Sequence, residues 1–330
     1  MGAEPLHFLA VAGPTASGKS ELAMALARRL DGELISADSR QIYRGMDVGT
    51  AKPSREDRAQ VPHHGLDLCS PSERYSAGQF GRDARRWIQE IRSRGRVPIV
   101  VGGTGFFLGA LLTPIFREPP MDGERRRILK GILTKWDPAW LAAAVERLDP
   151  VRAEVALAGG RARMMRTLEV ALLTGRPLSW WHAHAPPEAA PVPGLVVLIR
   201  WKRAELNHRI RSRAQAMWRS GLFPEVKTLL QAGFGPGDPG FSGQGYREAA
   251  QVLNGEMTPE DGLERTIVRT RQYARRQETW FRHQLPPGSL ELDGELPLSQ
   301  RVIRVAREWE ARGGWVGPGA RTAAPRGDAK

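Results

Sequence analysis

The chain has 330 residues, and 41% of them are hydrophobic, which is enough for a sizeable core and excludes global disorder. Its net charge of +13 and isoelectric point of about 10.7 indicate a polyanionic partner. The single cysteine, Cys69, excludes an intramolecular disulfide and a Cys/His zinc finger, and it favours a reducing compartment such as the cytoplasm. No apolar run approaches the ~20 residues of a membrane span. The N-terminus leads straight into an expected strand, so no signal peptide is predicted.

An apolar run over residues 6–12 is followed by a glycine-rich stretch and then by a helix-like run over residues 21–30. The stretch has the G-x-x-x-x-G-K-[ST] pattern of a phosphate-binding loop, with a strand before it and a helix after it. Its residues are Gly13, Pro14, Thr15, Ala16, Ser17, Gly18, Lys19 and Ser20. Glycines let backbone N–H groups turn toward phosphate oxygens, and the helix N-terminus adds positive potential. Lys19 would reach the terminal phosphates and Ser20 would be a Mg²⁺ ligand, so the motif predicts binding of a di- or triphosphate.

A second expected strand, residues 33–37, ends in Asp38, Ser39, Arg40 and Gln41. Polar residues just past the carboxyl end of a parallel strand point into the ligand crevice of an α/β sheet. Asp38 is therefore a candidate general base or Mg²⁺ ligand. An aspartate in this position is also a common turn-former or helix cap, and position alone does not choose among these roles.

The expected strand over residues 96–101 ends in Gly102, Gly103, Thr104 and Gly105. Many nucleotide hydrolases carry a Walker-B aspartate at this point. Its replacement by Gly-Gly-Thr argues against an ordinary ATPase, and it makes Thr104 a candidate hydrogen-bond donor to the reacting group. A glycine turn with a helix-capping threonine is the alternative interpretation.

Strands and helices alternate from residue 6 to residue 112, which predicts an α/β fold with a parallel sheet and helices on both faces. A fifth strand is expected at residues 195–199, after a long interruption bounded by proline pairs. We therefore predict a P-loop core in two parts, residues 1–118 and 188–312, with an inserted all-helical domain at residues 119–187. Residues 313–330 are rich in Gly, Ala, Pro and Arg and are expected to be a disordered tail.

The predicted insert contains three helix-like runs, at residues 124–135, 138–148 and 162–173, and it is rich in arginine. The second part of the core contains expected helices at residues 203–218, 222–232 and 259–284. In the last of these, basic residues alternate with Tyr273 and Trp280, a pattern that suits RNA because phosphates bind the cations and bases stack on the rings. The alternative is a solvated basic helix whose Trp280 and Phe281 face the core. The weak strand over residues 63–68 begins with a histidine pair, which we interpret as structural.

Six motifs occur in a fixed order along residues 6–282: GPTASGKS, ADSRQIYRGMDVGTAKP, PHHGLDL, VGGTGF, QGYRE and TRQYARRQETWFR. Together they resemble the tRNA dimethylallyltransferase (tRNA isopentenyltransferase) family, bacterial type. The resemblance implies a P-loop core with a helical insert that binds the anticodon stem-loop of tRNA. It also implies transfer of a dimethylallyl group from dimethylallyl diphosphate to N6 of the adenosine 3′-adjacent to the anticodon, with Mg²⁺ and release of pyrophosphate.

The same resemblance implies roles for individual residues where the motifs match. Asp38 corresponds to the general base, Thr104 to a residue that assists at the diphosphate and contacts substrate, and Arg213 to an arginine that holds the pyrophosphate. Residues implied to contact tRNA are Asp38, Ser39, Arg40, Gln41, Thr104, Arg125, Arg163, Arg166, Gln244, Gly245, Tyr246, Arg247, Arg275, Arg276, Gln277, Thr279, Trp280 and Arg282.

The chain departs from the family pattern in two places. Family members commonly carry D-P-x-R before the R-A-L-E-V helix, whereas this chain has Gly159-Gly160-Arg161-Ala162-Arg163 there, so the roles implied at residues 162–165, that of Arg163 included, rest on the weakest part of the match. Eukaryotic relatives carry a C-terminal zinc finger that a single cysteine cannot form. A monomer is expected. Two other classes stay open: a P-loop kinase of small molecules or nucleotides, in which Asp38 would deprotonate a hydroxyl, and an RNA-binding NTPase.

Overall fold

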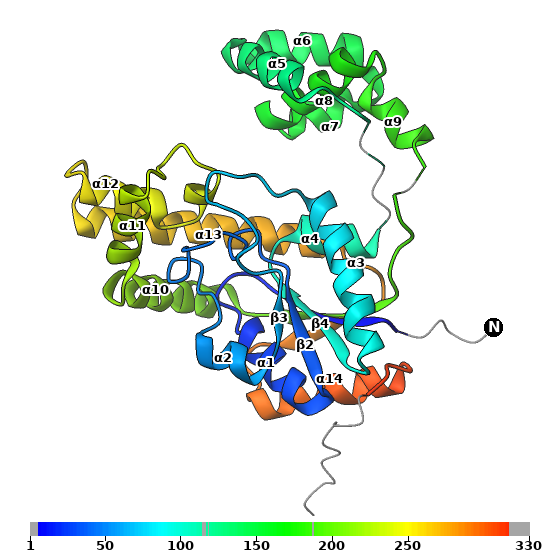
Figure 1. Cartoon of the computed structure of the whole chain (residues 1–330), viewed down its shortest axis with the longest axis vertical. Helices are drawn as coiled ribbons and strands as arrows, with labels where there is room; N and C mark the ends of the chain where they lie inside the picture. Colours follow the sequence, from blue (N-terminus) through cyan, green and yellow to red (C-terminus); the bar gives the residue numbers. More distant parts are fainter. Residues whose placement is uncertain (1–5, 114–116, 118, 187, 317–330) are drawn as a thin grey trace, which may run out of the picture. The chain divides into compact units, whose positions relative to one another are not determined.

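The computed structural model describes residues 6–113, 117, 119–186 and 188–316. It divides into two compact units, one formed by residues 1–113 and 191–330 and the other by residues 114–190. The first unit is the α/β core, and the second is an insertion between two of its strands (Figure 1).

The core contains a six-stranded sheet with the strand order β3-β2-β4-β1-β5-β6, and every pairing in it is parallel. The strands are β1 (Phe8–Ala12), β2 (Gly32–Ser36), β3 (His63–His64), β4 (Val97–Gly102), β5 (Gly194–Arg200) and β6 (Leu290–Asp293). The predicted parallel sheet is thus confirmed, but it has one strand more than expected. β6 is a four-residue edge strand beside β5; its Leu-Glu-Leu-Asp sequence alternates apolar and polar residues, but only over the shortest run that indicates a strand.

Helices cover both faces of this sheet (Figure 1). Those of the core are α1 (Lys19–Leu30), α2 (Arg55–Gln60), α3 (Ala77–Ser93), α4 (Gly105–Leu112), α10 (Arg203–Arg219), α11 (Leu222–Gln231), α12 (Tyr246–Leu253), α13 (Pro259–Gln284) and α14 (Leu298–Ala311), with the 3₁₀ turn η2 (Gly240–Ser242). In β1, Phe8 and Ala10 belong to the cluster that includes α3 and α4, whereas Leu9 and Val11 belong to the cluster with α1 and α14. Burial on both faces explains why β1 is continuously apolar rather than alternating.

The insert has its own small core. Its helices are α5 (Gly123–Lys135), α6 (Pro138–Leu148), η1 (Pro150–Arg152), α7 (Ala153–Ala158), α8 (Arg161–Thr174) and α9 (Leu178–His184). Leu133, Leu141 and Leu168 are buried at its centre. Arg161, which opens α8 after the family departure at Gly159-Gly160, donates to the carbonyls of Leu133, Thr134 and Trp136 and so caps the end of α5.

The end of the core chain is more ordered than the composition suggested. Trp309 on α14 is buried, and its indole N–H donates to the carbonyl of Trp315 at 2.8 Å. Gly314 N–H returns to the Trp309 carbonyl at the same distance. Residues 313–316 therefore pack on α14, whereas residues 317–330 of the expected disordered tail lie outside the described residues.

Candidate active site

The phosphate loop connects β1 to α1 at the carboxyl edge of the sheet. Its backbone has positive φ at Ala16 (64°) and at Gly18 (82°), where α1 begins. Gly18 is suited to this conformation, whereas Ala16 adopts it against the preference of a residue with a Cβ. Residues of this conformation that alternate with negative-φ residues, as Ala16 and Gly18 do around Ser17, turn successive N–H groups to one side and create an anion-binding concavity.

The loop is also held from outside by side chains of the second part of the core. Arg209 Nε donates to the Ala16 carbonyl at 2.9 Å, and Trp201 Nε1 donates to the Ser17 carbonyl at 3.0 Å. The Arg209 guanidinium lies over the Trp201 ring, 4.3 Å from its centroid. Sequence reasoning missed both residues because they are almost 200 positions away from the loop and carry no motif.

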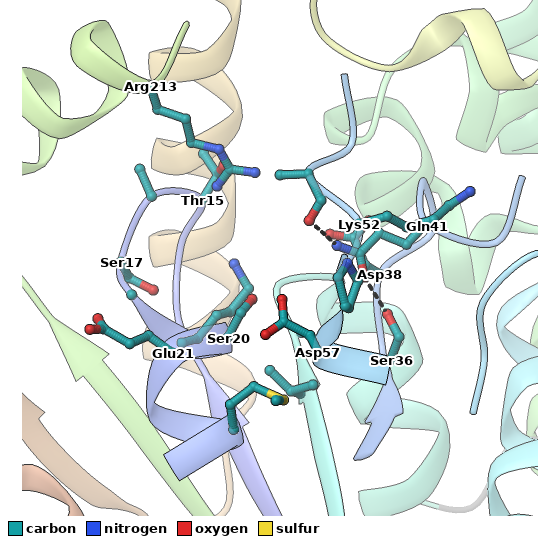
Figure 2. A pocket seen from close by; sticks show the side chains of 18 of the residues that line it. Thr15, Ser17, Ser20, Glu21, Ser36, Asp38, Gln41, Lys52, Asp57 and Arg213 are labelled. Atoms are coloured by element: carbon teal, nitrogen blue, oxygen red, sulfur yellow. Dashed lines mark hydrogen bonds between the residues drawn. The ribbon is translucent and has the colours of Figure 1, made fainter. Parts of the chain in front are cut away.

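A cavity of about 980 Å³ lies over the loop and the ends of the neighbouring strands. Its walls include residues 15–20 of the loop, Asp38 and Gln41 after β2, and Arg209 and Arg213 on α10. Figure 2 shows the Arg213 side chain extending from α10 into the cavity, near Thr15. The fold thus brings three predicted groups together: the phosphate loop, Asp38 and Arg213.

Lys19 and Arg213 are two half-buried cations that line this cavity, and Arg213 acts on Lys19. Burial lowers the pKa of Lys19 to about 8, the Asp38 carboxylate opposes that shift, and Arg213 adds to it. Burial also lowers the pKa of Arg213, again opposed by Asp38. Both cations are therefore poorly solvated, and a bound polyanion would relieve that cost.

Asp38 follows β2, and one of its predicted roles, that of a turn-former, is visible in its hydrogen bonding. Its Oδ1 accepts a hydrogen bond from Arg40 N–H at 2.8 Å, the local bond expected of a turn-former. Its charge also acts on Lys19 and Arg213 across the cavity. The structure therefore places a turn-forming carboxylate inside the candidate site.

Thr104 lies beside Asp38 because β4 is adjacent to β2 in the sheet. Its Oγ1 accepts a hydrogen bond from Ser39 N–H at 3.0 Å, and it lies 3.3 Å from Ser39 Oγ. No side-chain hydrogen bond caps α4, so the capping interpretation of Thr104 is not supported within the described residues. Tyr273 on α13 is close to the same group: burial and Asp38 raise its pKa to about 12, while Thr104 acts in the opposite direction. The sequence pattern assigned Tyr273 only to a generic aromatic surface.

The two residues after Ser39 use their side chains within the protein. Gln41 accepts a hydrogen bond from Ser36 Oγ at 2.8 Å, and its Nε2 donates to the carbonyls of Thr50 and Ala51. Arg40 Nη1 donates to Ser242 Oγ at 2.7 Å and to the Pro239 carbonyl at 3.2 Å. Direct tRNA contacts by these two residues stay predictions.

Lys52, in the loop after β2, has its charge paired within the protein. Its side chain is fully buried and its ammonium contacts Asp47 at 2.5 Å and Asp67 at 2.6 Å. The lysine therefore fixes the loop after β2 rather than binding substrate.

The predicted tRNA-contacting stretch before α12 is partly in the core. Tyr246 is fully buried, and its hydroxyl donates to Glu225 Oε1 at 2.6 Å. Gly245 has a φ of 94°, and its N–H donates to Glu248. Gln244 and Arg247 are half-buried. Of these four residues, only Gln244 and Arg247 keep partly accessible side chains.

Helix α13 has both features that its sequence suggested: an exposed basic face that suits RNA, and aromatic residues that face the core. Phe281 and Gln277 are buried. The other predicted tRNA-contacting residues of the helix are half-buried or exposed. Trp280 is half-buried against Gly105 and Gly109 of α4. Among the predicted tRNA contacts on this helix, the side chains exposed to solvent are those of Arg275, Arg276, Thr279 and Arg282.

In the insert, Arg125 and Arg163 are exposed. Arg166 is half-buried and donates to the buried Glu169 at 2.8 Å, so part of its charge is neutralised locally. Hydrogen bonds from Arg126 and Arg166 lower the pKa of Glu169 although burial acts in the opposite direction.

Across the described residues, no cluster of three or more His, Cys, Asp or Glu side chains could hold a metal ion by itself. The cavity nevertheless offers Ser20 and the Asp38 carboxylate beside the phosphate loop. Mg²⁺ is commonly held by one or two protein oxygens together with substrate phosphates. The donor set therefore fits a magnesium–diphosphate complex better than a metal bound by the protein alone.

Comparison with known proteins decides the family. The family model described as IPP transferase matches residues 41–284. The chain belongs to the IPP transferase family. It is 44% identical over 275 residues to tRNA dimethylallyltransferase 1 of Pelobacter propionicus, covering 83% of this chain and 89% of the relative. It is 40% identical to tRNA dimethylallyltransferase 2 of Geotalea uraniireducens, covering 85% and 90%.

Solved structures of the family share the fold. A tRNA isopentenylpyrophosphate transferase from Bacillus halodurans has a TM-score of 0.66 and 31% identity, covering 94% of this chain and 97% of that one. A eukaryotic dimethylallyltransferase described as acting on tRNA has a TM-score of 0.76 and 29% identity, covering 92% and 79%. As in this family, the core here has a parallel sheet flanked by helices. In the described part of the chain, no helix is long and apolar enough to cross a membrane.

Proposed function

We propose that the protein transfers a dimethylallyl group from dimethylallyl diphosphate to N6 of the adenosine 3′-adjacent to the anticodon in tRNA and releases pyrophosphate. The observation that carries the proposal is the position of Asp38. It is a carboxylate in the same cavity as the phosphate loop, Lys19 and Arg213, which supports a role as base beside a diphosphate bound there. The names of the relatives supply the substrate class.

The reaction forms a bond between N6 of the adenine and C1 of the dimethylallyl group, and it breaks the bond between C1 and the diphosphate oxygen. The electron pair of the broken bond leaves with pyrophosphate, and the N6 proton moves to the Asp38 carboxylate. A positioned general base typically contributes about 10²–10⁴-fold. The hydrogen bond from Arg40 N–H fixes the carboxylate in orientation.

The leaving pyrophosphate gains negative charge as the bond breaks. Lys19 and Arg213 are poorly solvated cations in the cavity, so their attraction for this charge is screened less than it would be in water. Mg²⁺, held by Ser20 together with phosphate oxygens, would supply further neutralisation of the leaving group. Thr104, fixed by Ser39, would orient the reacting groups between the two strand ends.

The target adenine must leave its stack to reach the cavity, because its N6 atom has to come next to the bound diphosphate inside the protein. Exposed Arg275, Arg276 and Arg282 on α13 are suited to phosphates of the RNA backbone, as are Arg125 and Arg163 of the insert. The other two classes are less favoured: the family membership points to prenyl transfer, and no Walker-B aspartate follows β4.

One labelling experiment tests the proposal. The protein is incubated with radiolabelled dimethylallyl diphosphate or with γ-labelled ATP, each with and without tRNA. We expect tRNA-dependent transfer of the prenyl label to an adenosine and no transfer of the γ-phosphate. Phosphate transfer to a small molecule would support a kinase, and tRNA-stimulated ATP hydrolysis without prenyl transfer would support an NTPase.

A further inference from the structure

Helix α13 presents a stripe of three side chains, Tyr273, Gln277 and Trp280, to the turn after β4. They are spaced by four and three residues, so they lie on one face of the helix. Gln277 binds the Gly103 carbonyl, and Trp280 packs against Gly105. The turn that carries Thr104 is therefore contacted from behind by a helix that is more than 160 positions later in the chain.

Gln277 makes two hydrogen bonds that connect this turn to the phosphate loop. Its Oε1 accepts from Thr15 N–H at 2.9 Å, and its Nε2 donates to the Gly103 carbonyl at 2.8 Å. A side-chain amide is suited to this position because it offers one acceptor and one donor on a single planar group. Glutamate offers no donor and methionine offers only a weak acceptor.

The contact is close and buried. Gln277 is 6% exposed; its hydrogen bond to the Gly103 carbonyl is buried, and the one from Thr15 N–H is partly buried. A Cβ added at Gly103 would lie 2.2 Å from Gln277 Nε2, and one added at Gly105 would lie 2.2 Å from Trp280. The glycines of the Gly-Gly-Thr-Gly turn thus permit the approach of α13.

We propose that Gln277 is a positioning residue for the diphosphate site, and that it is not a direct tRNA contact. Because Thr15 precedes Ala16, fixing the Thr15 amide restricts a loop that must adopt a left-handed conformation at Ala16 and Gly18. A loop fixed before the ligand arrives loses less conformational freedom on binding. The second hydrogen bond fixes the Thr104 turn relative to that loop. The proposal rests on the proposed function only in taking a diphosphate as the ligand of the loop.

The test compares Gln277→Met with Arg282→Gln, a variant of the exposed side of the same helix. Methionine keeps the size of the side chain and loses both hydrogen bonds. We measure binding of inorganic pyrophosphate with Mg²⁺ and without tRNA, binding of tRNA alone, and the KM values for both substrates. For Gln277→Met we expect pyrophosphate affinity to fall by about tenfold or more and tRNA affinity to stay within about twofold. For Arg282→Gln we expect tRNA affinity to fall and pyrophosphate affinity to stay within about twofold.

Phe281→Leu controls for general loosening of the helix, because Phe281 is buried in the core one turn away and contacts neither loop by a hydrogen bond. It should lower the melting temperature as much as Gln277→Met does and leave pyrophosphate affinity unchanged. If Phe281→Leu weakens pyrophosphate binding equally, Gln277 has a merely structural role and the proposal is wrong.

Two further outcomes would overturn the proposal: unchanged pyrophosphate affinity in Gln277→Met, or a loss confined to tRNA binding. Failure of the proposed function is recognised separately, since wild-type protein would then transfer no prenyl group to tRNA. Pyrophosphate binding by the variants would still decide the role of Gln277 in that case.

Discussion

Asp38, after β2, and Arg213, on α10, line one cavity, and the Asp38 carboxylate acts on the Arg213 guanidinium. The Arg213 guanidinium is buried enough that its pKa falls, and the Asp38 carboxylate is the group that opposes this fall. Lys19 responds to both residues. The site is therefore a small network of one acid and two poorly solvated cations. Substitutions at these three positions should have non-additive effects on the free energy of binding.

Asp38→Asn should separate binding from chemistry. Asparagine can still accept the hydrogen bond from Arg40 N–H, so the turn after β2 should persist. It cannot take the N6 proton. We expect tRNA affinity to change little and single-turnover transfer to fall by about 10²–10⁴-fold.

Asp38→Ala serves as the control for the turn, since it loses both the proton acceptor and the local hydrogen bond. A rate loss in Asp38→Asn that high Mg²⁺ partly rescues, together with weaker pyrophosphate binding, would show that Asp38 acts mainly as a metal ligand. Unchanged transfer in Asp38→Asn would remove the base from the mechanism.

Arg213→Gln should weaken stabilisation of the leaving pyrophosphate. Loss of one preorganised group at a developing charge typically costs about 10²–10³-fold in rate. Arg211→Gln on the same helix is the matched control, because Arg211 is paired with Glu264 on the surface. Single-turnover transfer rates of the two variants measure the difference, and equal effects would contradict a specific role for Arg213.

Binding of tRNA should depend steeply on salt. If the protein meets on the order of five phosphates, the logarithm of the affinity should fall with the logarithm of salt concentration with a slope of about −3 to −5. Arg125→Gln should make this slope less steep by about one, whereas Arg127→Gln should change it less because Arg127 is paired with Glu124. A nearly flat salt dependence would argue against an electrostatic tRNA interface.

Glu33 in β2 should make the core sensitive to acid. Burial acts to raise its pKa, but hydrogen bonds from Arg94 and His64 outweigh burial and leave the pKa below its ordinary value of 4.5. The resulting stability is present above about pH 4.5 and is lost as the pH falls through the folded-state pKa.

Glu33→Gln should therefore lower the free energy of unfolding by about 1–3 kcal/mol near pH 7 and reduce the loss of stability on acidification. Denaturant unfolding at several pH values measures both effects. Glu310→Gln, at an exposed position of α14, is the control and should leave the acid limb of the curve unchanged.

Two truncations of the C-terminal segment, one before residue 317 and one before residue 314, should have different effects. Removal of residues 317–330 should leave turnover on saturating tRNA within about twofold. Removal of residues 314–330 takes away the carbonyl that accepts the Trp309 indole N–H, so we expect a further loss of about 1–2 kcal/mol in unfolding free energy. Thermal unfolding and turnover of the two truncations check this, and a large fall in turnover with the shorter truncation would show that residues 317–330 act at the site.

The sequence alone determined the phosphate loop, because its residue types and their spacing are local requirements of phosphate binding. It also determined the parallel sheet, because runs such as residues 8–12 must be buried on both faces. The position of Asp38 after a strand was enough to place it at the sheet edge, where the structure finds it.

Only the tertiary structure decided which distant side chains hold the loop. Arg209, Trp201 and Gln277 bond its backbone from 184 to 262 positions away, and no periodicity records such pairings. The structure also divided α13 into a buried face and an exposed one. Long-range packing determines which side chain of a basic and aromatic helix faces a loop and which faces solvent, and local residue pattern does not.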